Sequence, residues 1–99
     1  MYAVIRELTV RPKAEEQMRA AGEEFSALRA QQPGFRGSMR IDAGDGRMVV
    51  VTLWEDEQAV EAARPVLQAE AERLLQPHLA APVRFVYRGP VVADDLTAR

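Results

Sequence analysis

The chain has 99 residues, no cysteine and one histidine, with a formal net charge of −2 at pH 7 and a pI of about 5.4. These counts exclude disulfides, thiolate metal sites and a multi-histidine metal site, so we expect no bound metal. An acidic chain also argues against nucleic acid as a partner, because phosphate binding needs a basic face. No apolar run approaches the roughly 20 residues of a membrane span and no signal peptide is visible, so we expect a cytoplasmic protein without a membrane partner.

A strand and an amphipathic helix are predicted at the start of the chain. Residues 2–10 are rich in β-branched and aromatic side chains and stop at Arg11-Pro12, which predicts a strand. From about residue 13 to residue 31, apolar residues recur every three or four positions, which predicts a helix with one apolar face. The opposite face is interpreted as solvated surface and carries Glu15, Glu16, Arg19, Glu23, Glu24 and Arg29.

A hairpin is predicted next. Pro33-Gly34 ends the helix, and residues 35–42 then predict a second strand that begins with an aromatic side chain. The turn Ala43-Gly44-Asp45-Gly46 leads into a third strand over residues 47–54, which is the most hydrophobic in the chain and ends in the only tryptophan.

The remaining segments predict a second helical region and a fourth strand. The helical region begins near Asp56, whose carboxylate can cap the first turn. Proline fits the first turn of a helix and breaks its middle, so Pro65 predicts two pieces, residues 56–64 and 65–76. Residues 83–88 predict the fourth strand. We expect a single domain over residues 1–92, followed by a C-terminal tail over residues 93–99.

The order β-α-β-β-α-β predicts an α+β ferredoxin-like fold, an antiparallel sheet with both helices on one face. The third strand is apolar on both faces: Val49, Val51 and Leu53 point one way, and Met48, Val50 and Trp54 the other, with Thr52 as the only polar interruption. Two helices can cover only one of these faces. A second copy of the sheet would cover the other, so the pattern predicts a homodimer closed face to face.

Candidate ligand-binding residues lie on the third and first strands. Trp54, Thr52 and Val50 share one strand face, where the indole N–H is free to donate a hydrogen bond and the threonine hydroxyl can orient a ligand. A core tryptophan packed under the helices is the alternative. Arg6 lies among apolar neighbours on its own strand face, and a charge there needs a partner, either across the dimer or on an anionic ligand.

The fourth strand adds two weaker candidates for the cavity wall, Phe85 and Tyr87. Strict alternation places both of them on one face with Val83, and places Arg84 and Arg88 with Val86 on the other. His78 is interpreted as a surface residue at a helix end. An RNA-recognition module would need exposed aromatic residues on its central strands beside basic residues, and this acidic chain has neither.

The sequence resembles the antibiotic biosynthesis monooxygenase family of dimeric α/β barrels over nearly its whole length, residues 2–92. The resemblance rests on the Val10-Arg11-Pro12 exit of the first strand, on Gln32-Pro33-Gly34-Phe35, and on Val49-Val50-Val51-Thr52-Leu53-Trp54-Glu55. It implies a small homodimer with an apolar pocket in each subunit. Some members oxygenate anthrones or quinols with O₂ and no cofactor, and the substrate anion supplies the electrons.

By this resemblance Trp54 matches the pocket tryptophan of the family. The sequence differs from particular members of the family at other positions. Arg6 falls where haem-degrading relatives have an asparagine, and a histidine is missing after Trp54, which argues against haem degradation. Val50 occupies the position of a polar amide in anthrone-oxygenating members. Arg6 is the candidate that replaces this donor and stabilises a substrate anion.

The lead hypothesis is therefore a cofactor-independent monooxygenase acting with O₂ on a small phenolic, anthrone or quinol substrate. Trp54 and Arg6 would be catalytic, and Thr52, Val50, Tyr87 and Phe85 would bind substrate. Two alternatives remain open from the residues. One is a non-catalytic module that binds an apolar metabolite, and the other is a non-oxidative isomerase that would use a carboxylate such as Glu7 as its acid or base.

Overall fold

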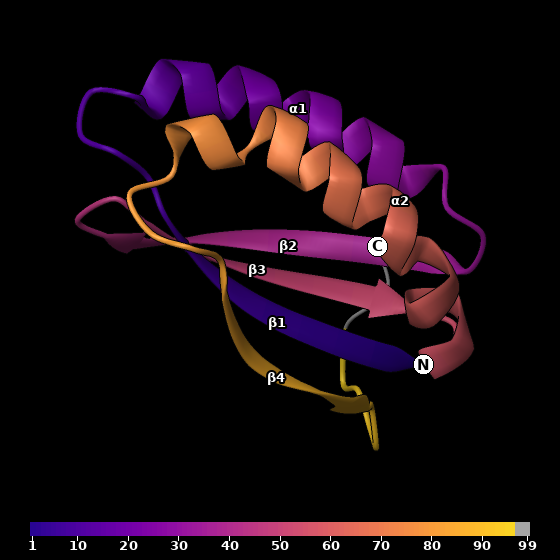
Figure 1. Cartoon of the computed structure of the whole chain (residues 1–99). Coiled ribbons are helices and arrows are strands. Elements are labelled where there is room, and N and C mark those ends of the chain that lie inside the picture. The colour runs from indigo at the N-terminus through magenta and orange to yellow at the C-terminus, as the bar shows by residue number, and fades with distance from the viewer. Residues whose placement is uncertain (97–99) are drawn as a thin grey trace.

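A computed structural model describes residues 1–96 of the chain and shows a four-stranded antiparallel sheet with two helices on one face (Figure 1). The sheet order is β2-β3-β1-β4, so β1 and β3 are central. The elements in chain order are β1 Tyr2–Thr9, α1 Glu15–Ala30, β2 Phe35–Gly44, β3 Arg47–Trp54, α2 Glu57–Leu74, a 3₁₀ turn Gln76–His78 and β4 Arg84–Pro90. The predicted α+β ferredoxin-like order is confirmed.

The core between sheet and helices forms two clusters of buried side chains. One lies around Trp54 and the other around Met18, and β1 contributes to both because Tyr2, Val4 and Leu8 share the inner face along the length of the strand. The members of the first are Tyr2, Val4, Trp54, Val60 and Ala63, and those of the second are Leu8, Val10, Met18, Leu75 and Leu79. The inner face of the sheet is therefore packed against the helices at two places.

The second helix corrects one prediction, because Pro65 lies inside a continuous helix and does not divide it. An interior proline removes one backbone hydrogen bond and costs about 3 kcal/mol. Here its ring is exposed to solvent, while Val60, Ala63 and Leu67 form one apolar stripe that passes from one side of the proline to the other. Packing of this stripe holds both halves of α2 on the sheet. The predicted cap is present, since Asp56 Oδ1 accepts a hydrogen bond of 2.9 Å from the Ala59 amide.

The fourth strand corrects a second prediction, because a bulge shifts its register against β1. Ile5 pairs with Tyr87, but the next residue, Arg6, pairs with Phe85, so Val86 is the additional residue. The alternation of faces therefore reverses at this point. Phe85 and Tyr87, predicted on one face, lie on opposite faces of the sheet.

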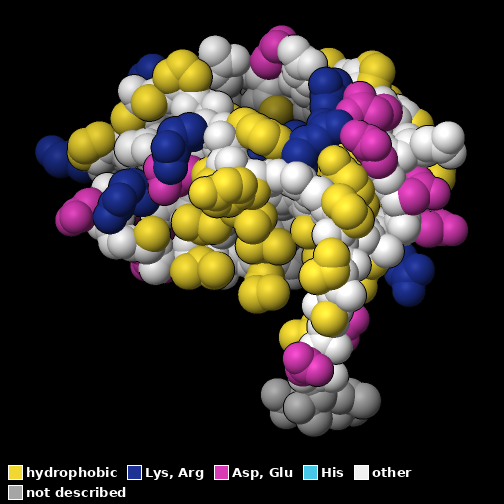
Figure 2. All heavy atoms as spheres, turned by 90° about the horizontal axis from the view of Figure 1, so that it is seen from below, with side chains coloured by type: hydrophobic (Ala, Val, Ile, Leu, Met, Phe, Trp, Pro, Cys, Tyr) yellow, Lys and Arg dark blue, Asp and Glu magenta, His cyan; other side chains and the backbone are white. Residues whose placement is uncertain are grey.

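The outer face of the sheet carries apolar side chains and is not covered by any element of residues 1–96. Figure 2 views the molecule from this side and shows hydrophobic side chains gathered over the middle of the sheet. Exposed members include Met39, Ile41 and Tyr87. Residues 91–96 continue beyond β4 without regular secondary structure, and residues 97–99 of the predicted tail lie outside the described part. Among the described helices, none is both long and apolar enough to cross a bilayer.

Candidate functional site

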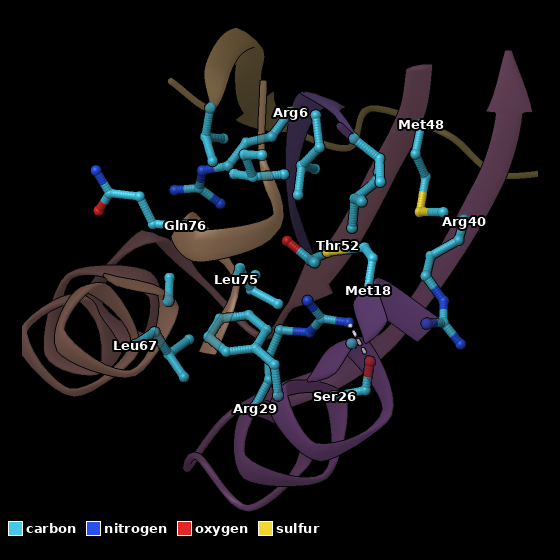
Figure 3. Close-up of a pocket in the computed structure, with 18 of the residues that line it drawn as sticks. Arg6, Met18, Ser26, Arg29, Arg40, Met48, Thr52, Leu67, Leu75 and Gln76 are labelled. Carbon is cyan, nitrogen blue, oxygen red and sulfur yellow. Dashed lines mark hydrogen bonds between the residues drawn. The ribbon is translucent and has the colours of Figure 1, made fainter. Parts of the chain in front are cut away.

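A cavity of about 1190 Å³ lies between the two helices and the inner face of the sheet. Drug-sized ligands occupy cavities of roughly 300–1,000 Å³, so this space is large enough for a polycyclic molecule. Figure 3 shows side chains from β1, β3, α1 and α2 converging on it. Its apolar lining includes Leu8, Met18, Val50, Leu67, Leu75 and Phe85. The cavity lies where the two core clusters leave space between them, since members of both line it.

Thr52 and Trp54 form a hydrogen-bonded pair in the inner wall of the cavity. Each side chain is only 3% exposed, and Trp54 Nε1–H donates to Thr52 Oγ1 at 3.0 Å. Thr52 Oγ1 in turn donates to the Val4 carbonyl at 3.5 Å. The sequence interpretation left the indole N–H free to donate a hydrogen bond to a ligand, but in the structure this N–H already donates to a residue of the same strand. Trp54 therefore contributes its apolar surface to the cavity, and Thr52 holds the indole in place.

Aromatic packing fixes the position of Trp54 further. The ring of Phe35, the first residue of β2, meets the indole edge to face, with centroids 5.3 Å apart and an interplanar angle of 80°. Such pairs contribute about 0.5–1.5 kcal/mol beyond their buried area. The motif that brings an aromatic residue into β2 and the tryptophan that ends β3 are thus neighbours, because Phe35 and Trp54 are register partners.

Arg6 projects from the central strand β1 into the cavity, as Figure 3 shows. It lies beside the bulge, where it pairs with Val50 on one side and Phe85 on the other. The hydrogen bonds and ion pairs of residues 1–96 include none from its side chain. Burial, and then repulsion by Arg64 and Arg88, lower the pKa of the Arg6 guanidinium. A guanidinium nevertheless stays protonated, so a half-buried positive charge faces the cavity.

Arg29 is a buried cavity residue that the sequence interpretation missed, because it was placed on the solvated face of α1. Its side chain is buried, 6% exposed, and its guanidinium reaches the cavity from the last turn of the helix (Figure 3). The signal was present in the spacing. Arg29 follows Phe25 by four residues, and such pairs share one helix face. Phe25 belongs to the apolar stripe, so Arg29 belongs to the same side.

The surroundings of Arg29 are aromatic and cationic. Its guanidinium carbon lies 5.6 Å from the Phe25 ring centroid and 5.8 Å from that of Phe35. Nη2 donates a long hydrogen bond of 3.4 Å to Ser26 Oγ, while the buried Nε has no hydrogen-bond partner among the described residues. Burial, and then repulsion by Arg40 and Arg6, lower the pKa of this guanidinium.

The structure brings together five of the six predicted site residues. Arg6, Val50, Thr52, Trp54 and Phe85 all line the cavity, although Phe85 is half exposed at its rim. Tyr87 does not line it. The bulge in β4 directs this side chain to the outer face, where it is 72% exposed.

A further arginine, Arg88 of the edge strand β4, does not line the cavity and instead forms hydrogen bonds with β1 and α2. Its Nη2 donates to Glu57 at 2.7 Å and to Glu61 at 3.0 Å, and its Nε donates to the Tyr2 hydroxyl at 3.0 Å. The hydrogen bonds with Glu57, Glu61 and Tyr2 raise the pKa of Arg88. This network joins β4 and β1 to the start of α2, and we interpret it as structural.

Comparisons with known proteins agree with this fold. The family model described as antibiotic biosynthesis monooxygenase matches residues 1–65. No curated protein sequence matches the chain significantly. NE2512 of Nitrosomonas europaea, a protein of unknown function, is 17% identical over 99% of this chain and 95% of its own, with a TM-score of 0.80. Rv0793 of Mycobacterium tuberculosis is 19% identical over 96% and 98% of the two chains, with a TM-score of 0.77.

A third similar structure carries a ligand. It is a mutant of MhuD with two manganese protoporphyrin IX molecules bound per active site, 23% identical over 95% of this chain and 97% of its own, with a TM-score of 0.72. At these identities the likeness shows the fold alone.

The residues of the present cavity do not fit a haem. Histidine, cysteine and tyrosine are the usual single protein ligands of haem iron, and none of them lines the cavity within residues 1–96. His78 lies in the 3₁₀ turn and is not part of the lining. The described residues also contain no group of three or more metal-binding side chains.

Proposed function

This chain belongs to the antibiotic biosynthesis monooxygenase family, and we propose that it oxygenates a small phenolic, anthrone or quinol substrate with O₂, without a cofactor, in the cavity between sheet and helices. The observation that supports the proposal most is the guanidinium of Arg6, which faces a mainly apolar cavity and forms no ion pair with a carboxylate among the described residues. A half-buried cation of this kind stabilises an anion that forms during a reaction.

The chemistry follows from the electron balance. Conversion of the CH₂ group of an anthrone to a carbonyl retains one oxygen atom of O₂ in the product and releases the other as water. The substrate supplies all four electrons, and it reacts readily only after it has lost a proton to become an enolate or phenolate. The protein then has three tasks: to bind a flat ring, to stabilise its anion and to exclude water.

Residues of the cavity suit these tasks in different ways. Arg6 is assigned to the substrate oxygen that becomes negative, since it is the cation on the sheet side of the cavity. Trp54, Val50 and Phe85 are assigned to the apolar walls that hold the ring. Thr52 is assigned a positioning role through Trp54, because its hydroxyl accepts the indole N–H.

The non-oxidative isomerase loses the example of an acid or base that the sequence suggested for it. Glu7 lies on the outer face of the sheet, where it pairs with Arg84 at 3.5 Å, and it does not line the cavity. A non-catalytic module that binds an apolar metabolite would use the same cavity. It differs from the oxygenase in one observable, which is the consumption of O₂ together with the ligand.

We propose further that a single domain over residues 1–92 forms a homodimer through the outer face of the sheet. An outer face on which the apolar side chains of Met39, Ile41 and Tyr87 are exposed supports this arrangement, since monomers rarely leave a large apolar patch uncovered. Sedimentation equilibrium at micromolar concentration should give twice the chain mass of 11.0 kDa. A mass of one chain would contradict the dimer.

The experiment for the activity measures oxygen uptake by the purified, cofactor-free protein with anthrones, hydroquinones and naphthols. We expect uptake above the autoxidation of at least one compound, and a loss of at least about tenfold in Arg6→Leu, because the anion loses a charge-assisted hydrogen bond. Arg73→Leu is the matched control, since Arg73 is an exposed arginine of α2 that pairs with Glu70. Trp54→Phe should also lower uptake by changing the cavity wall.

Two results would contradict this proposal. If no compound raises uptake above autoxidation, the oxygenase is rejected in favour of the binding module. If Arg6→Leu keeps full activity while uptake is enzyme-dependent, the role of Arg6 is wrong.

A further inference from the structure

The buried charge of Arg29 has no counter-ion in the described part of the chain. Its hydrogen-bonding consists of one long contact, from Nη2 to Ser26 Oγ at 3.4 Å, and the buried Nε donates to nothing. The charged groups that most affect its pKa are also cations, Arg40 and Arg6. A buried guanidinium normally has a carboxylate or several acceptors, because desolvation of an unpaired charge is unfavourable.

The neighbours of Arg29 leave the cavity as the direction from which a partner can come. Phe25 and Phe35 lie within 6 Å of its guanidinium carbon, and their ring faces offer no lone pairs. Ser26 occupies part of one end of the guanidinium. Figure 3 shows the group directed into the space that Thr52, Leu75 and Arg6 also border.

We propose that the ligand of this cavity is an aromatic carboxylic acid and that Arg29 binds its carboxylate. The two Nη groups of one guanidinium lie in one plane and form a pair of donors that a carboxylate accepts in bidentate fashion. An anion at this position also offsets the repulsion among Arg6, Arg29 and Arg40. The apolar walls around it accommodate the ring to which the carboxylate is attached.

A carboxylate fits this site better than a phosphate does. A phosphate ester carries up to two negative charges and accepts hydrogen bonds on three oxygens, whereas Arg29 offers one planar group of donors between two aromatic rings. Among residues 1–96, the neutral hydroxyl of Ser26 is the only group that forms a hydrogen bond with it. Two oxygens and one charge match this set of donors.

The inference deepens the proposed function, because it rests on the same cavity and names a second group on the substrate. Arg6 and Arg29 approach from opposite layers, one from the sheet and one from α1. The substrate would then be a hydroxylated aromatic acid, with its reacting oxygen at Arg6 and its carboxylate at Arg29.

The test uses unreactive ligands, so that it does not depend on oxygen chemistry. Isothermal titration calorimetry on the full chain compares benzoate, 2-naphthoate and 2-anthroate with the corresponding neutral aryl methanols, and 2-naphthyl phosphate with 2-naphthoate. We expect at least one acid to bind about 10- to 100-fold more tightly than its alcohol, the range of a charge-assisted hydrogen bond. This comparison is made on the unaltered protein and needs no variant.

Variants then locate the interaction. Arg29→Met should remove the preference for the acid while the affinity for the alcohol stays nearly unchanged. Arg19→Met is the matched control on the same helix, because Arg19 lies at the cavity rim, is exposed and pairs with Glu16. It should retain the preference.

Three results would overturn the proposal: no acid binds more tightly than its alcohol, the preference survives in Arg29→Met, or the phosphate ester binds more tightly than the carboxylate. Oxygen uptake without a preference for acids would leave the proposed function standing and reject the carboxylate site. A preference for acids without oxygen uptake would do the reverse.

Discussion

Arg88 and Arg29 show how the same side chain has two different roles in one small domain. Both guanidinium groups lie near aromatic rings at similar distances, 5.7 Å from Tyr2 for Arg88 and 5.6 Å from Phe25 for Arg29. Arg88 also has two carboxylates and a phenol as hydrogen-bond acceptors, whereas Arg29 has one distant hydroxyl. A cation that is compensated within the chain holds elements together, and one that is not can bind an anion from outside.

Among polar groups that have a partner within the chain, we expect the largest effect on stability from the hydrogen bond between Trp54 and Thr52. Thr52→Val keeps the shape of the side chain and leaves the buried indole N–H without an acceptor. We expect the free energy of unfolding to fall by about 1–3 kcal/mol. Urea unfolding measures this, and Thr52→Ser, which keeps the hydroxyl, is the control. Equal stability of Thr52→Val and the original chain would show that the pair contributes nothing.

The two arginines themselves should respond to the same substitution with opposite signs. Arg29→Met removes an unpaired buried charge, so the free energy of unfolding of the ligand-free protein should rise by about 1 kcal/mol. Arg88→Met leaves Glu57, Glu61 and Tyr2 without their shared donor, so it should lower the midpoint of unfolding. Chemical unfolding of both variants under one set of conditions makes the comparison. A loss of stability in both would mean that Arg29 is also structural.

The smallest effect on stability is expected from the ion pair between Glu7 and Arg84. It lies on the outer face at 3.5 Å, with the Arg84 side chain 67% exposed, and pairs of this kind contribute about 0–1 kcal/mol. Glu7→Gln should therefore change stability little and leave oxygen uptake unaltered. A large fall in turnover would return Glu7 to the site and revive the isomerase.

The sequence predicted the secondary structure well because the signals for it are local. The apolar run of β3, the three-and-four spacing of α1 and the cap at Asp56 each depend on residues a few positions apart. Pro65 was misinterpreted for the same reason. Its local preference for a helix start was overridden by packing of the stripe from Val60 to Leu67 on the sheet.

The faces of β4 could not be predicted, because a bulge arises between two strands and is not a property of one. Val86 is additional only relative to the register of β1, and this separates Phe85 from Tyr87. The bulge turns Tyr87 away from the cavity and leaves Phe85 in its wall.

The sequence by itself determined the order of the elements, the family and the cavity wall around Trp54, since hydrophobic periodicity and short motifs specify these. Only the tertiary structure decided which polar groups have partners. Arg88 finds Tyr2 across 86 positions of the chain, whereas Arg29 pairs with no carboxylate of residues 1–96 although acidic residues are close to it in sequence. Electrostatic compensation depends on distance in space and on exclusion of water, and neither is determined by spacing along the chain.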